Sequence, residues 1–135
     1  MDHVISGVDT HKANHIAVAI DAQGARLGCT TISTTREGSR DLEVWAAQFG
    51  QVKAIGIEGA GAFGAGLSRD LLAKGHDVLD VMRPNRQLCY LHGKSDSLDA
   101  ESAARSVLNG HAVRSLRVIA TAIETSIASL AVNHL

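Results

Sequence analysis

The chain has 135 residues, a length that fits one domain. Hydrophobic residues make up 45% and aromatic residues 3%, so we expect a core of Val, Ile, Leu and Ala, with no signal peptide and no membrane span. The formal net charge of −1 argues against a uniformly basic nucleic-acid binder, and Cys29 and Cys89, outside any CxxC pair, favour the reduced cytoplasm over a disulfide framework.

The first part of the chain predicts an antiparallel meander followed by a helix. Three stretches have the composition of strands: Val4–Val8, His15–Asp21 and Arg26–Thr34. The first is a buried apolar run that ends in Asp9, and a turn at Gly24 precedes the third. Thr35 is the predicted N-cap of a helix over residues 36–49, which Gly50 closes.

The second part predicts alternating strands and helices. These are strands over 52–57 and 76–82, and helices over 63–74 and 97–108. Such β-α units continue a sheet in parallel, so we predict a three-layer α/β domain with a five-stranded mixed sheet. Residues 118–135 predict an amphipathic C-terminal helix that either folds back or lacks its partner.

Four carboxylates stand where strands end or a helix begins. Asp9 ends the first predicted strand, Glu58 ends the fourth, and Asp96 and Asp99 share one face of the last helix through their i, i+3 spacing. If the first and fourth strands are neighbours, the four acids converge at one sheet edge. Clustered like charges are costly without cations, and Mg²⁺ prefers oxygen ligands, so the pattern favours a metal site for phosphoryl transfer. Taken singly, each acid is also explained as a turn, cap or surface residue.

Four motifs carry a resemblance to a known family. They are Gly7–Lys12 (GVDTHK), Gly56–Gly59 (GIEG), Arg83-Pro84 and Gly93–Ala100 (GKSDSLDA). In this order and spacing, over roughly residues 4–110, the sequence resembles the DEDD insertion-sequence transposases, a group that includes the Piv/MooV-type DNA invertases.

The resemblance implies an RNase H-like (RuvC-like) domain that cuts and rejoins DNA. It also implies that Asp9, Glu58, Asp96 and Asp99 bind Mg²⁺ or Mn²⁺, and that a guide (bridge) RNA is a partner, as for some members. Members carry a downstream domain with a nucleophilic serine, for which we find no counterpart here. We therefore expect a truncated transposase, with residues 1–112 as the catalytic domain and 113–135 as the start of a linker or second domain.

The basic residues beside these acids are the predicted phosphate contacts. They are Lys12, Arg83, Arg86 and Lys94. Arg83 and Arg86 are equally well explained as caps of the fifth predicted strand or as partners of Asp80. Because a second domain is missing, we also expect homo-oligomers through residues 118–135.

A second interpretation is an NAD(P)-binding oxidoreductase. Gly59, Gly61 and Gly64 form a GxGxxG after a strand and before a helix, and Asp80 stands where a ribose-binding acid would. Against it, Glu58 would lie close to the pyrophosphate, and three antiparallel strands precede the motif.

Three further alternatives stay open. An actin-like ATPase shares the first hairpin, although the chain is short for two lobes. A zinc site from Asp9, His11 and His15 lacks a complete ligand set. The third is a non-catalytic remnant that binds nucleic acid without cutting it.

Overall fold

A computed structural model describes residues 2–82, 96–111 and 113–116. Its elements are β1 (His3–Thr10), β2 (Asn14–Ile20), β3 (Arg26–Ser33), α1 (Arg36–Ala47), β4 (Gln51–Glu58), α2 (Ala65–Ala73), β5 (Val78–Val81), α4 (Asp96–Asn109) and β6 (Val113–Ser115). The expected helix over 118–135 lies outside the described residues. The Thr35 N-cap is confirmed, because its Oγ1 accepts a hydrogen bond from the backbone amide of Gly38 at 3.4 Å.

The strands form one mixed sheet in the order β3-β2-β1-β4-β5-β6. β1, β2 and β3 pair antiparallel, β1, β4 and β5 pair parallel, and β6 pairs antiparallel with β5. The prediction of five strands was therefore one short. β6 has three residues and lies at the start of residues 113–135, the segment assigned to a linker or second domain. Such a short strand carries no alternating pattern, and its pairing with β5 is a tertiary contact that local sequence does not encode.

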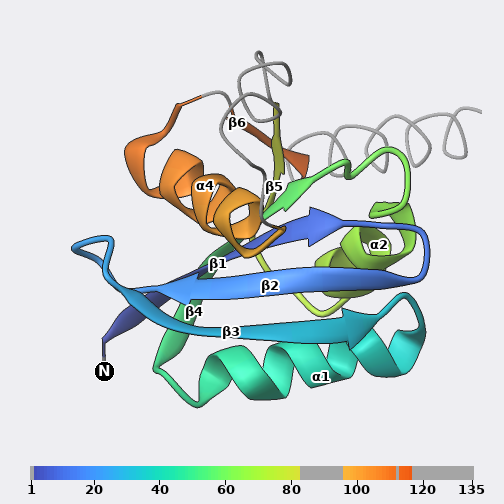
Figure 1. The fold of residues 1–135 in the computed structure, drawn as a ribbon, viewed down its shortest axis with the longest axis horizontal. Helices are drawn as coiled ribbons and strands as arrows, with labels where there is room; N and C mark the ends of the chain where they lie inside the picture. The colour runs from blue at the N-terminus through green and yellow to red at the C-terminus, as the bar shows by residue number, and fades with distance from the viewer. Residues whose placement is uncertain (1, 83–95, 112, 117–135) are drawn as a thin grey trace, which may run out of the picture.

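Helices cover both faces of the sheet, which confirms the three-layer arrangement (Figure 1). α1 and α2 cover one face over a core that includes Val8, Ile57 and Leu71. α4 covers the other face, where Ala100 and Ala104 pack on residues of β1 and β2. Among the described helices, none is long and apolar enough to cross a membrane.

Two glycines let α4 approach the sheet closely. Gly7 of β1 and Gly56 of β4 are register partners at the centre of the sheet. A Cβ on Gly7 would lie 2.9 Å from the Cα of Ala104 and closer still to the backbone oxygen of Ala100. A Cβ on Gly56 would lie 3.1 Å from the backbone oxygen of Ala103. Only residues without a side chain fit beneath the helix, so this pair determines where α4 sits on the sheet.

Candidate functional site

Asp9 and Glu58 lie side by side at the carboxyl ends of two neighbouring strands. They are Cα register partners across the parallel pair β1 and β4. Each stands two residues after a glycine that faces α4, Gly7 or Gly56, so strand alternation turns both acids toward the helix-covered face. Asp9 is 4% exposed and Glu58 8%. The predicted convergence of these two carboxylates is therefore present in the fold.

The third carboxylate comes from α4. Asp99 is 5% exposed and directly precedes Ala100, the residue that covers Gly7. Asp99 and Ala103 are four residues apart, so the buried stripe of the helix continues to Asp99. Asp96 is the first residue of α4, and its side chain lies outside the described part of the structure. Three of the four predicted acids are thus buried on or against one face of the sheet.

Two neighbouring residues hold the ends of β1 and β4. The Nε2 atom of His11 is 3.0 Å from Oδ2 of Asp9, and the His11 side chain is 41% exposed. The hydroxyl of Thr10 donates to the backbone oxygen of Glu58 at 2.7 Å. Sequence reasoning assigned neither role, although both residues belong to the GVDTHK motif. Thr10 bonds to the strand end that carries one acid, and His11 contacts the carboxylate of the other.

The described residues alone do not make a complete metal shell. Within residues 2–82, 96–111 and 113–116, no group of three or more His, Cys, Asp or Glu side chains is arranged to hold a metal ion. The zinc alternative from Asp9, His11 and His15 is therefore wrong. His15 and Ile16 are consecutive residues of β2, so their side chains point to opposite faces of the sheet. Ile16 packs in the core on the α4 face, which Asp9 also faces, so His15 points away from Asp9. Oxygen donors from Asp9, Glu58 and Asp99 have the chemistry of a Mg²⁺ or Mn²⁺ site rather than a zinc site.

His15 is a buried histidine with a structural contact. It is 1% exposed, and its Nδ1 accepts a hydrogen bond from the backbone amide of His11 at 3.3 Å. Burial lowers the pKa of His15 below its ordinary value, and the nearby His11 lowers it further. The folded protein therefore keeps this ring neutral and uses it to hold the β1–β2 connection.

The backbone amides of the glycine-rich turn, residues 59–64, form hydrogen bonds within the turn itself. The backbone oxygen of Gly59 accepts hydrogen bonds from the amides of Ala62 and Gly64, both at 3.0 Å. Asp80, the expected ribose ligand, pairs instead with Arg114 at 3.2 Å. Both observations disfavour the dinucleotide interpretation, because the amides and the acid that it needs are engaged within the protein.

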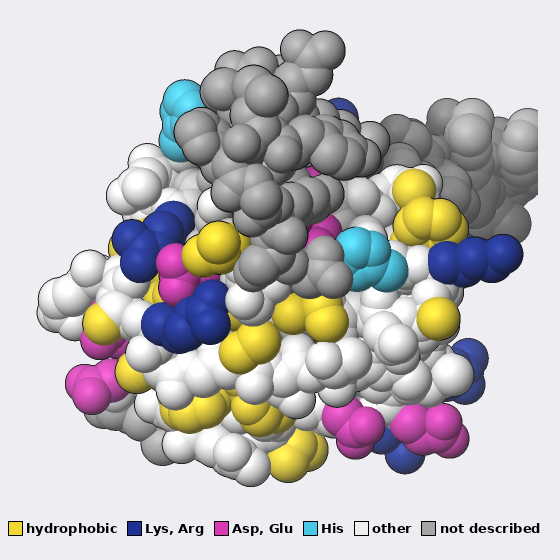
Figure 2. All heavy atoms as spheres, in the orientation of Figure 1, with side chains coloured by type: hydrophobic (Ala, Val, Ile, Leu, Met, Phe, Trp, Pro, Cys, Tyr) yellow, Lys and Arg dark blue, Asp and Glu magenta, His cyan; other side chains and the backbone are white. Residues whose placement is uncertain are grey.

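The predicted phosphate contacts are only partly visible. Lys12 is exposed in the connection between β1 and β2, beside Asp9 in the chain, whereas Arg83, Arg86 and Lys94 lie outside the described residues. Lys, Arg and acidic side chains also gather on the surface over α4 (Figure 2), where Glu101 pairs with Arg26 at 2.8 Å. Of the four predicted phosphate contacts, only Lys12 lies within the described residues, three positions after Asp9 in the chain.

Comparisons with known proteins agree with this geometry. Residues 6–131 match the family model of the IS110-type DEDD transposases, described as a transposase, so the match extends beyond residue 110, where the sequence resemblance was expected to end. The fold is similar to Thermus thermophilus RuvC in complex with a Holliday junction substrate, with a TM-score of 0.55, 14% identity, and coverage of 84% of this chain and 99% of that one. A second Thermus thermophilus RuvC structure gives a TM-score of 0.53 at the same identity and coverage. No curated protein sequence matches the chain.

Proposed function

The chain belongs to the IS110-type family of DEDD transposases, and on that premise we propose that it is the domain that cuts and rejoins DNA strands by metal-dependent phosphoryl transfer. The observation that carries the proposal is the register pairing of Asp9 with Glu58, with Asp99 brought to the same face by α4. The RuvC-like fold supports a nuclease-type function. One RuvC neighbour is described with a Holliday junction, which supports DNA as the substrate class.

In this proposal, Asp9, Glu58, Asp96 and Asp99 hold Mg²⁺ or Mn²⁺. When bound, such ions activate an attacking oxygen and stabilise the leaving oxygen of a phosphodiester. The protein contributes carboxylates held in a buried place, so that little reorganisation is needed when the metal and DNA arrive. The cost of gathering several negative charges without a counter-ion supports a cation as the natural occupant.

The neighbouring residues have supporting roles. His11 contacts Asp9 at 3.0 Å and restricts the orientation of that carboxylate. Thr10 bonds to the backbone oxygen of Glu58 and holds the end of β4 against β1. Lys12, Arg83, Arg86 and Lys94 contact DNA phosphates beside the acids. Recognition of a guide RNA, self-association, and a separate segment after residue 112 remain predictions from the sequence.

Cleavage of a four-way DNA junction in Mg²⁺ or Mn²⁺ tests the proposal. Asp9→Asn and Glu58→Gln keep the size of each side chain and remove its charge, so we expect cleavage to fall by more than about 100-fold, beyond the usual effect of disturbing only the ligands' surroundings. Asp41→Asn, at an exposed position of α1, is the matched control and is expected to cleave like the wild type. Equal cleavage by Asp9→Asn and wild type would contradict the proposal.

A further inference from the structure

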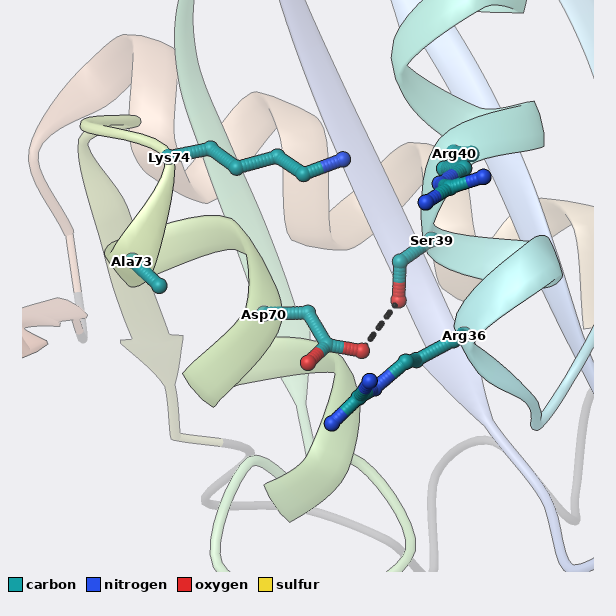
Figure 3. A pocket seen from close by; sticks show the side chains of 6 residues that line it. All are labelled: Arg36, Ser39, Arg40, Asp70, Ala73 and Lys74. Atoms are coloured by element: carbon teal, nitrogen blue, oxygen red, sulfur yellow. Dashed lines mark hydrogen bonds between the residues drawn. The ribbon is translucent and has the colours of Figure 1, made fainter.

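A pocket lies between α1 and α2, on the face of the sheet opposite the carboxylates. Its volume is about 300 Å³, and it is lined by Arg36, Ser39, Arg40, Asp70, Ala73 and Lys74. Figure 3 shows the side chain of Lys74 extending from the end of α2 toward α1, where Arg36 and Arg40 stand on the other side. The proposed metal site does not use any of these residues.

The pocket carries an excess of positive charge. Three of its six lining residues are cationic and one, Asp70, is acidic. Arg36 and Arg40 are four residues apart, so their side chains lie about 6 Å apart along one face of α1. In the part of the chain that the structure describes, neither guanidinium has an ion-pair partner, whereas Lys74 binds Glu43 at 2.9 Å. Arg36 and Arg40 are therefore the cations available to a ligand.

The walls of the pocket are tied together by polar contacts. The hydroxyl of Ser39, which is 2% exposed, donates to Oδ2 of Asp70 at 3.0 Å and so joins α1 to α2. Glu43 of α1 receives both Lys74 and His76. Burial alone would raise the pKa of Glu43, but the hydrogen bonds and charges of Lys74 and His76 lower it overall, so it stays ionised and holds both partners. A pocket braced in this way needs little ordering when a ligand binds.

We propose that this pocket binds a phosphate group of a nucleic-acid backbone. Guanidinium groups match phosphate oxygens in shape and charge, and two of them one helical turn apart span a single phosphate. Both arginines are exposed, so a phosphate that belongs to a long polymer can reach them as easily as a free one. The site gives the domain a second contact with nucleic acid, behind the sheet and independent of the carboxylates.

Fluorescence anisotropy with a labelled DNA duplex, measured over a range of salt concentrations, tests the site. The variant is Arg36→Gln/Arg40→Gln, which removes both charges and keeps helix propensity. We expect binding to weaken by about five- to tenfold at 0.1 M salt, and the slope of log K against log salt to shrink by about 1, because one phosphate contact is lost. Arg69→Gln is the control, since Arg69 is an exposed arginine of α2 that does not line the pocket.

Each outcome decides between the alternatives. If the double variant binds DNA with the affinity and salt slope of the wild type, a nucleic-acid site here is excluded. The same conclusion follows if the double variant loses no more DNA affinity than Arg69→Gln does. Thermal unfolding with inorganic phosphate distinguishes the source: a rise in Tm for the wild type but not the double variant, with unchanged DNA binding, would assign the pocket to a small phosphate compound and overturn the backbone proposal. Asp9→Asn leaves Arg36 and Arg40 in place, so substituting both arginines in that variant is expected to change the slope of log K against log salt as it does in the wild type. The pocket proposal can therefore be tested separately from the metal proposal.

Discussion

Replacing Gly7 with alanine tests whether the close approach of α4 organises the site. The new Cβ would lie 2.9 Å from the Cα of Ala104, against about 3.4 Å at ordinary contact, and closer to backbone atoms of Ala100 and Ala104. Backbone atoms within a helix cannot rotate away as a side chain can, so α4 must lift from the sheet. Overpacking costs about 1–3 kcal/mol, and we expect the upper end, about 3 kcal/mol, for Gly7→Ala.

Urea unfolding measures this cost through the midpoint at unchanged m-value. The control is Gly66→Ala in α2, where a Cβ meets nothing within 4 Å. That variant is expected to be more stable by roughly 0.5 kcal/mol, because alanine restricts the unfolded chain and favours a helix. Lifting α4 also displaces Asp99 from Asp9, so junction cleavage by Gly7→Ala should fall by about 100-fold for a shift of about 1 Å. An unchanged midpoint for Gly7→Ala would refute the packing argument.

Three further variants test individual contacts. Thr10→Val removes the hydrogen bond to the backbone oxygen of Glu58 at nearly constant volume, and urea unfolding should show a loss of about 1 kcal/mol; no loss would mean that the bond does not hold β4. For His15, the folded pKa is lowered from 6.5, so the unfolded chain binds the extra proton and stability declines as the pH falls below 6.5. His15→Gln should flatten that decline in unfolding measured between pH 7 and 5, and an identical pH profile would contradict it. Ser39→Ala leaves Asp70 without its partner across the helices, and we expect thermal unfolding to reveal about 1 kcal/mol of destabilisation, against none if water replaces the hydroxyl.

Much of the site follows from local sequence patterns. Gly7-Val8-Asp9 and Gly56-Ile57-Glu58 repeat one pattern, a glycine and then an acid two residues later. Strand alternation puts the glycine and the acid on one face, and parallel pairing puts the two copies side by side. The carboxylate pair was therefore within reach of the sequence, on the condition that the first and fourth strands are neighbours, and the two glycines indicate where α4 packs.

Other features depend on contacts between distant segments. β6 exists through pairing with β5, and its three residues carry no periodic signal. The pocket between α1 and α2 forms because Arg36 and Arg40 face Lys74, which lies 34 or more positions later in the chain. The charge pattern along the sequence does not predict that these cations lie close together, because their proximity depends on how two helices pack on one face of the sheet.

Manganese binding by isothermal titration tests the central claim that carboxylates far apart in the chain share divalent cations. The wild type is expected to bind Mn²⁺, and Asp9→Asn, Glu58→Gln and Asp99→Asn should each weaken binding by about 10- to 100-fold or more. Asp41→Asn should bind as the wild type does. Wild-type affinity in all three site variants would contradict a shared metal site.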